Sequence, residues 1–130
     1  MTSNSNNTNN KYDYDYVVIG GGSGGVSSAK RAAQLYHKKV AIIEGNRWGG
    51  TCVNVGCVPK KIMWQAASIR ECMIEEAPHY TLPTVDGAAA AGDAQFKINW
   101  PKLKAQRDAY IQRLNGIYRS GLDKAGVKVL

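Results

Sequence analysis

Two short, uninterrupted apolar runs, Tyr16–Ile19 and Val40–Ile43, mark the first half of the chain. Both are rich in β-branched residues and end at glycine or a charged residue, a pattern typical of strands buried on both faces. Residues 26–37 between them repeat apolar side chains at helical spacing, which predicts a helix. Its packed face is expected to hold Val26, Ala29, Ala33 and Tyr36. Strand, helix and strand in this order predict a Rossmann-like, doubly wound α/β fold, with a parallel sheet and a ligand at the carboxyl ends of its strands.

The second half of the chain predicts two longer helices and a further strand. One helix is expected from Pro59 to near Pro78, and another is capped by Asn99 and entered through Pro101. Their packed faces are expected to hold Ile62, Ala66, Ile69 and Met73 in the first helix, and Leu103, Tyr110, Ile111, Leu114 and Tyr118 in the second. Val127–Leu130 begins another apolar strand, so the predicted sheet is incomplete at this point.

Length and composition are those of one domain. The chain has 130 residues, of which 44% are hydrophobic and 21% charged, enough for a single core. Its first residues are mostly Asn, Ser and Thr, so residues 1–11 are expected to form a disordered tail. Residues 12–130 then form the nucleotide-binding domain. Within it, residues 79–95 combine Pro, Gly and Ala without periodicity, which predicts a surface insertion.

The chain is basic, with a formal net charge of +7. Its lysines and arginines are spread from Lys11 to Lys128, without the dense stripe that a nucleic-acid backbone requires, so no nucleic-acid partner is expected. The N-terminal residues hold no apolar run for a signal peptide or a membrane span, so we expect no membrane partner and a cytoplasmic location. A mitochondrial form would need an alternative start that adds a transit peptide.

A glycine-rich loop follows the first strand and carries the pattern G-x-G-x-x-G at Gly20, Gly22 and Gly25. In this pattern the first glycine makes the turn, the second admits a pyrophosphate, and the third lets helix pack on strand. Glu44 lies about 20 residues further on, where a carboxylate accepts hydrogen bonds from the ribose hydroxyls of an adenosine. The pattern is common to FAD and NAD sites. It disfavours NADP, because the 2′-phosphate of that cofactor would meet the Glu44 carboxylate. The alternative is an ordinary glycine-rich turn with an exposed glutamate.

Cys52 and Cys57 stand in a glycine-flanked loop just ahead of the helix expected from Pro59. Disulfide closure is feasible there, and the helix N-terminus stabilises a thiolate at Cys57 that can donate charge to an oxidised flavin. Cys52, as the more exposed partner, is then free to attack an external disulfide. The alternatives are two structural thiols or a metal site. A metal site would need about four ligands, which three cysteines and two distant histidines supply poorly, so none is predicted. Cys72 is expected to be a free structural thiol.

The run Gly49–Lys61 resembles the redox-active signature of the flavin disulfide reductases, the class that includes glutathione, trypanothione, thioredoxin and mercuric reductases and dihydrolipoamide dehydrogenase. With the glycine loop, the resemblance covers nearly all of Lys11–Trp64. Lys60 after the proline and the run Ile62–Trp64 are most similar to the glutathione reductases, and so is Arg107–Tyr118, which resembles the helix beside the disulfide substrate. The resemblance implies that the first dinucleotide site binds FAD.

The resemblance also implies roles for individual residues. Lys60 would lie near the reactive nitrogen of the flavin, where a cation stabilises developing negative charge. The family often has Arg where Lys30 stands. A lysine keeps the positive charge but loses the bidentate contact that an arginine makes with a carboxylate. The expected catalytic residues are Cys52, Cys57 and Lys60. The expected FAD contacts are Gly20, Gly22, Ser23, Gly24, Gly25, Glu44, Gly50, Thr51, Cys52 and Lys60. The expected glutathione contacts are Ser23, Lys30 and Tyr118.

The reaction that the resemblance implies is NADPH-dependent reduction of glutathione disulfide for cell redox homeostasis. NADPH reduces FAD, FAD reduces the Cys52–Cys57 disulfide, and Cys52 attacks glutathione disulfide, in an enzyme that is a homodimer when complete. No second G-x-G-x-x-G occurs in the sequence. We therefore expect an N-terminal fragment that lacks the NADPH and interface domains and is inactive alone. The alternatives are a trypanothione- or thioredoxin-type reductase, a non-catalytic FAD-binding fragment, and an NAD-dependent dehydrogenase with incidental cysteines.

Overall fold

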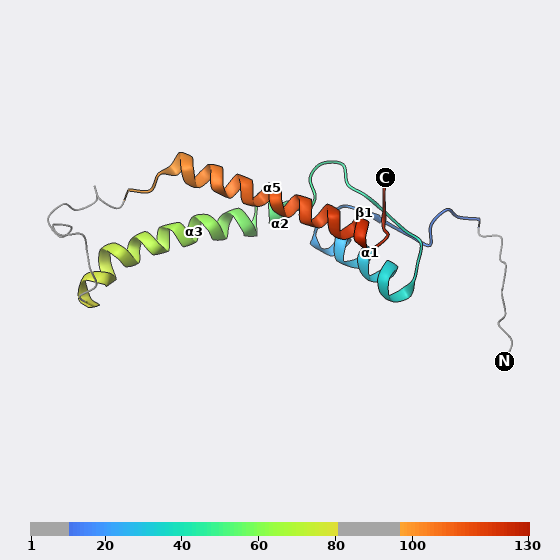
Figure 1. The fold of residues 1–130 in the computed structure, drawn as a ribbon, viewed down its shortest axis with the longest axis horizontal. Helices are drawn as coiled ribbons and strands as arrows, with labels where there is room; N and C mark the ends of the chain where they lie inside the picture. Colours follow the sequence, from blue (N-terminus) through green and yellow to red (C-terminus); the bar gives the residue numbers. More distant parts are fainter. Residues whose placement is uncertain (1–10, 81–96) are drawn as a thin grey trace.

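The computed structural model describes residues 11–80 and 97–130 (Figure 1). Nearly all of the predicted tail and of the predicted insertion at 79–95 lie outside the described residues. The described chain forms a small α/β part at one end and an arm of two long helices that projects from it (Figure 1). Within these residues, no helix is both long enough and apolar enough to cross a membrane.

The sheet consists of β1 (Tyr16–Ile19), β2 (Val40–Ile43) and β3 (Lys128–Val129), all parallel and in the order β1-β2-β3. The central strand β2 contributes most to the core, because three of its residues are at most 1% exposed: Val40, Ala41 and Ile42. A strand hydrogen-bonded on both sides and covered on its faces is favoured when every side chain is apolar. The predicted α/β class and parallel sheet are therefore confirmed.

Helix α1 (Ser23–Tyr36) connects β1 to β2 and buries Val26 and Ala29, as predicted. Tyr36 was expected on the same packed face but is 61% exposed, so that prediction is wrong. The reason is that the helix ends at Tyr36, where the chain turns toward β2 through His37 in the left-handed conformation. The His37 amide closes this turn by donating to the Ala32 carbonyl.

The cysteine region is more helical than predicted. Cys52 lies in the short helix α2 (Gly50–Asn54) rather than in a loop, and α3 (Cys57–Glu71) begins at Cys57 rather than at Pro59. Pro59 is tolerated in the first turn of α3, where an amide would have no partner within the helix. The helical chain then continues to the expected end near Pro78, through the π-helix η1 (Cys72–Glu76) and the 3-10 helix η2 (Ala77–Tyr80).

The last helix, α5 (Trp100–Lys124), begins as predicted at a cap in which the Asn99 side chain accepts from the Lys102 amide at 3.0 Å. It runs through Gly121 and buries Ile111 and Leu122. Leu122 is fully buried and completes the core, together with Val18, Val26, Ala29, Val40, Ile42 and Val127. Of the predicted face, Leu103, Leu114 and Tyr118 are half-buried, whereas Tyr110 is exposed, so the prediction is wrong there.

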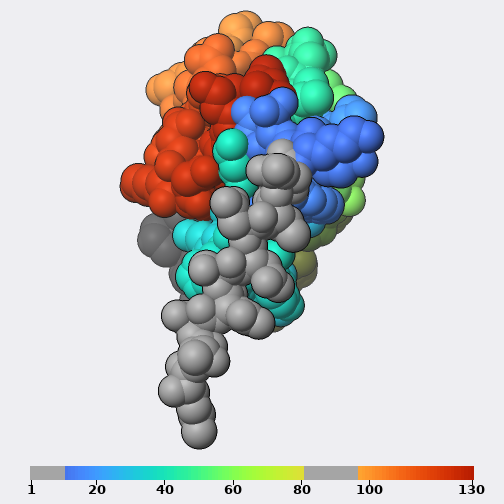
Figure 2. Space-filling model, turned by 90° about the vertical axis from the view of Figure 1, so that its right-hand side faces the viewer, coloured from blue at the N-terminus to red at the C-terminus, as the bar shows by residue number. Residues whose placement is uncertain are grey.

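The arm consists of α3 and α5, which lie against one another as an antiparallel pair (Figure 1). All residues of α3 are described and none is fully buried. Ile69 in α3 and Met73 in η1 were predicted on the packed face but are exposed, because among the described residues α5 is the long helix packed along α3 and it covers only a narrow stripe. At the opposite end of the molecule, residues near the start of the described chain, in blue, lie beside those near its end, in red (Figure 2).

Truncating Leu122 tests the core. We expect Leu122→Ala to lower the free energy of unfolding by about 2–5 kcal/mol, because it leaves a cavity between sheet and helices. Ile117→Ala is the matched control on the same helix, since Ile117 is 51% exposed, and it should cost less than about 1 kcal/mol. Urea unfolding followed by circular dichroism measures both; equal losses would contradict this packing.

Candidate functional site

The glycine loop makes a sharp exit from β1. Gly20 has a φ of +103°, a conformation that favours glycine, and its amide donates to the Ile43 carbonyl at 2.8 Å. A Cβ on Gly25 would lie 2.0 Å from the Gly20 carbonyl oxygen, so α1 approaches the loop too closely for any side chain there. The turn and the close helix–strand packing that the motif predicts are therefore both present.

Glu44 follows β2, with its carboxylate directed at the glycine loop. Its Oε2 accepts a hydrogen bond from the Gly21 amide at 2.6 Å, and its Oε1 accepts one from the Asn46 amide at 2.8 Å. A Cβ on Gly21 would lie 2.5 Å from the Trp48 ring, so any side chain at this position would displace that ring. No role was predicted for Gly21, although it stands in a run of consecutive glycines.

The glycine loop and the cysteine motif meet through their backbones. Gly22 and Gly49 form a parallel bridge, and the Gly49 amide donates to the Gly21 carbonyl at 2.8 Å. Gly49 and Gly50 have φ values of +95° and +62°, and a Cβ on Gly50 would lie 3.0 Å from the Gly22 Cα. Four glycines thus bring the start of α2 against the start of α1.

A hollow of about 220 Å³ lies beside this junction. It is lined by Glu44, Gly50 and Thr51, all predicted FAD contacts, and also by Asn46, Arg47, Asn54 and Val55. The first amides of α1 have no partner within their helix and suit an anion, and a Cβ on Gly24 would meet no described atom within 4 Å. Amide donors, a carboxylate and a cradle without side chains fit a dinucleotide.

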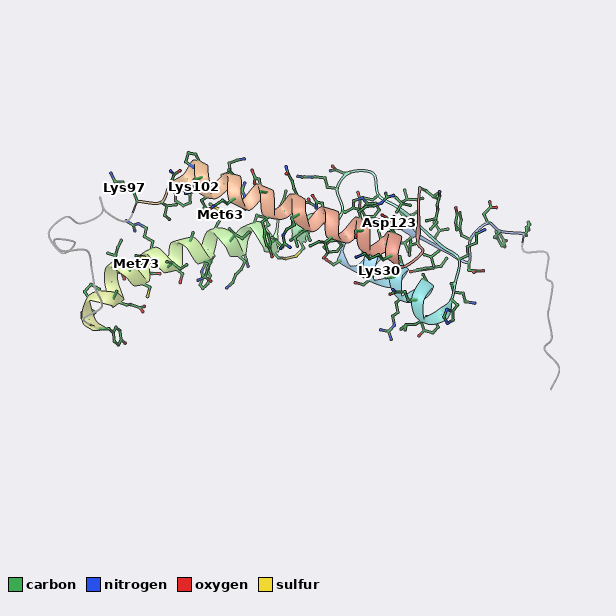
Figure 3. All side chains as sticks on the ribbon, viewed as in Figure 1. Lys30, Met63, Met73, Lys97, Lys102 and Asp123 are labelled. Carbon is green, nitrogen blue, oxygen red and sulfur yellow. A yellow bond between two sulfur atoms is a disulfide. The ribbon has the colours of Figure 1, made fainter. Side chains whose placement is uncertain are left out.

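The disulfide joins Cys52 in α2 to Cys57, the first residue of α3, with a Cα–Cα distance of 4.7 Å (Figure 3). It lies where the arm meets the α/β part. Cys57 is exposed and Cys52 half-buried, the reverse of the predicted exposure. The reason is that α2 packs against α5, whereas Cys57 opens a helix at the surface. The assignment of the attacking thiol to Cys52 therefore keeps only the support of the resemblance and stays a prediction.

A second hollow, of about 490 Å³, lies between α3 and α5 and reaches Cys57. It is lined by Cys57, Val58, Lys61 and Ile62 from α3, and by Leu103, Gln106, Arg107 and Tyr110 from α5. Lys60 is exposed on the first turn of α3. The next residue, Lys61, is the α3 cation that lines this hollow. Its ammonium lies 4.2 Å from the centre of the Trp64 ring. The predicted role of Lys60 stays a prediction.

The predicted glutathione contacts come together where α1 packs against α5. The hydroxyls of Ser23 and Tyr118 are 3.5 Å apart, although 95 positions separate them in the sequence. Lys30 reaches from α1 to α5, because a Cβ on Gly121 of α5 would lie 3.4 Å from the Lys30 Nζ (Figure 3). Two hydroxyls and an ammonium on one surface suit an anionic peptide.

Two asparagines in the site were given no role by the sequence analysis. Asn54 is 9% exposed and donates to the carbonyls of Trp48 at 3.0 Å and Gly50 at 2.8 Å. Asn115 donates to the same Trp48 carbonyl at 2.6 Å and to Asn54 Oδ1 at 3.1 Å. Both asparagines lie within the segments that carry the resemblance. Because 61 positions separate them, no local sequence pattern predicts that they pair.

Cys72 is a free thiol, as predicted, but it is exposed rather than part of the packed structure. It donates to Glu76 Oε2 at 3.6 Å. Partial desolvation and, after it, the neighbouring Glu76 carboxylate raise the pKa of the Cys72 thiol. Among residues 11–80 and 97–130, His, Cys, Asp and Glu form no group of three that could hold a metal ion.

The glycine loop can be tested with two neighbouring positions. Gly25→Ala should lower the free energy of unfolding by about 1–3 kcal/mol or more, because its Cβ would overlap the Gly20 carbonyl. Gly24→Ala is the control, since its Cβ points into open space within α1, and it should be neutral or stabilising by up to about 1 kcal/mol. Urea unfolding reports both; a stable Gly25→Ala protein would contradict the close approach.

The environment of Cys72 predicts its reactivity. Glu76→Gln removes the carboxylate that raises the thiol pKa, so a larger thiolate fraction at pH 8 should speed alkylation by iodoacetamide. Glu75→Gln is the control, one position away and outside that hydrogen bond. With Cys52 and Cys57 oxidised, mass spectrometry follows Cys72 as the free thiol. Equal rates in the two variants would show that Glu76 does not act on it.

Comparison with known proteins agrees with this geometry. A family model described as pyridine nucleotide-disulphide oxidoreductase matches residues 14–130. The chain is 54% identical over 112 residues to a glutathione reductase of Yarrowia lipolytica and 53% identical over 113 residues to one of Debaryomyces hansenii, covering 86% and 85% of this chain. It spans 22% of the length of each of these relatives. The chain belongs to the pyridine nucleotide-disulphide oxidoreductase family.

Proposed function

We propose that this chain supplies the FAD site and the redox-active disulfide of an NADPH-dependent glutathione-disulfide reductase. The observation that carries the proposal is the Cys52–Cys57 disulfide, whose helix α2 is held directly against the glycine loop through Gly49 and Gly50. A dithiol–disulfide couple beside a dinucleotide cradle is what electron transfer between the two requires. The two relatives named glutathione reductase support the choice of substrate.

The residues at the junction would hold FAD in distinct ways. The amides at the start of α1 would bind its pyrophosphate, and Glu44 would exchange its amide contacts for ribose hydroxyls. Gly20, Gly22, Ser23, Gly24, Gly25, Gly50, Thr51, Cys52 and Lys60 are the other proposed contacts. When bound, FAD supplies the two-electron chemistry that links a pyridine nucleotide to a disulfide. Cys57, at the N-terminus of α3, is placed for a thiolate stabilised by the helix dipole.

The reduced pair would act by thiol–disulfide exchange. The Cys52 thiolate attacks one sulfur of glutathione disulfide, which forms a mixed disulfide and releases one glutathione thiolate that takes up a proton. The Cys57 thiolate then attacks the Cys52 sulfur, which restores the Cys52–Cys57 disulfide and releases the second glutathione thiolate. NADPH would supply the two electrons for the next cycle in the complete enzyme.

The proposal extends to recognition and organisation. Glutathione carries carboxylates, which suit the Lys30 ammonium beside the hydroxyls of Ser23 and Tyr118. Residues 12–130 would form the FAD-binding domain, with a surface insertion at 79–95, in a homodimer located in the cytoplasm.

Trapping the mixed disulfide tests the proposed chemistry. Cys57→Ser leaves Cys52 without its resolving partner, so the reduced variant should accumulate one glutathione on Cys52 when glutathione disulfide is added. Peptide mass spectrometry identifies the modified residue. Reduced Cys52→Ser is the matched control. The resemblance, which alone assigns the attack to Cys52, predicts that this variant gains glutathione at Cys57 more slowly, although Cys57 is the more exposed cysteine. Faster modification of Cys57 would reverse the two roles, and no modification of either cysteine would contradict the proposed substrate.

Recognition of the substrate charge can be tested separately. Lys30→Ala should slow trapping by glutathione disulfide about threefold to tenfold, because one charge contact is lost. Trapping by the neutral disulfide of 2-mercaptoethanol should be unchanged. Lys38→Ala, which removes an exposed lysine just beyond α1, controls for the loss of net charge. A slower reaction with both disulfides would show that Lys30 acts on the fold and not on the substrate.

A further inference from the structure

A partly buried cluster of amides, in which Asn54 is buried, lies beside the disulfide. We call it the amide clamp: the side chains of Asn54 and Asn115 and the backbone carbonyl of Trp48. The carbonyl accepts from both side chains, at 3.0 Å from Asn54 and 2.6 Å from Asn115, and Asn115 also donates to Asn54 Oδ1 at 3.1 Å. The clamp thus joins α2, α5 and the loop before α2 at one point.

The position of the clamp relates it to the redox pair. Asn54 lies between the two cysteines in the sequence, inside the ring that their disulfide closes. Its side chain also donates to the Gly50 carbonyl at 2.8 Å, which ties down the first turn of α2. Asn115 lies one turn before Tyr118 on α5. The clamp therefore connects the disulfide ring to the helix that carries a proposed substrate contact.

The clamp matters most when the disulfide is open. In the oxidised chain, a covalent bond ties α2 to α3. In the dithiol, α2 is a helix of five residues, far too short to persist without tertiary contacts. The hydrogen bonds of the clamp are partly shielded from water, and Asn54 itself is buried, so breaking them leaves the Asn54 amide without a full set of partners. They keep α2 in its oxidised-state position and hold the two sulfurs near each other for closure.

We infer that Asn54 and Asn115 are positioning residues that preorganise the Cys52–Cys57 dithiol and so set its redox equilibrium. This inference rests on the proposed function, in which the pair opens and closes in each cycle. Without the clamp the dithiol gains freedom that the disulfide does not, so closure becomes less favourable and the disulfide becomes easier to reduce.

The test uses Asn115→Ala, because Asn54 also lines the proposed FAD hollow and Asn115 does not. The chain is equilibrated in buffers of reduced and oxidised dithiothreitol, quenched with acid and alkylated, and the reduced fraction of Cys52 and Cys57 is measured by mass spectrometry. We expect the equilibrium to shift toward the dithiol by about tenfold, or about 30 mV for this two-electron couple. Gln112→Ala, at an exposed position of the same helix, is the matched control and should match the parent chain.

Two further variants separate positioning from a general loss of structure. Asn115→Gln keeps an amide donor that is long enough to reach the Trp48 carbonyl and should give an intermediate shift. Asn54→Ala should shift the equilibrium in the same direction, and the double variant Asn54→Ala with Asn115→Ala should shift it by less than the product of the single effects, because both remove one cluster. Far-UV circular dichroism checks that each variant is folded.

The outcomes separate this inference from the proposed function, since the dithiothreitol equilibrium needs neither FAD nor glutathione. An unchanged equilibrium in folded Asn115→Ala would overturn the positioning role, even if glutathione is trapped normally on Cys52. The positioning role would also be overturned if the double variant shifted the equilibrium by the full product of the two single effects. A shifted equilibrium without glutathione trapping would support the clamp and contradict the proposed substrate.

Discussion

The close backbone approach of Gly21 and Gly22 to Gly49 and Gly50 is the contact on which the site depends. Here the loop after β1 and the segment before the disulfide share a hydrogen bond of 2.8 Å and a parallel bridge. A Cβ on Gly50 would already lie 3.0 Å from the Gly22 backbone. Since a side chain at Gly50 would press against the Gly22 backbone, this contact determines how near a dinucleotide bound at the loop would lie to the disulfide.

Helix α5 then holds this junction in place along its length. Leu122 anchors its end in the core, Tyr118 meets Ser23 of α1, and Asn115 binds the loop at Trp48. Successive turns of one helix therefore contact the sheet core, the proposed substrate surface and the disulfide segment. A substitution that shifts α5 is therefore expected to change the packing of the core, the proposed substrate surface and the position of the disulfide segment together.

The parts of the structure that could be predicted are those with a local signal. The β1–α1–β2 unit, the Asn99 cap and the glycine loop each follow from periodicity or from a residue required at one position. Helix α2 was missed because five residues with a glycine and β-branched side chains have little helix propensity, so tertiary contacts form it. The order of exposure of the cysteines and the Asn54–Asn115 pair depend on neighbours distant in sequence, which one sequence does not reveal. The exposure of Tyr36 was missed because no glycine or proline marks the end of α1 at that residue.

The central claim is that a dinucleotide cradle and a redox disulfide form one unit. The visible spectrum of the chain with added FAD, before and after two-electron reduction by dithionite, tests it most directly. The account predicts bound FAD and, after reduction, a long-wavelength thiolate-to-flavin band that is lost in Cys57→Ser and retained in Cys52→Ser. A chain that does not bind FAD, or one that binds FAD and shows no such band after reduction, would contradict it.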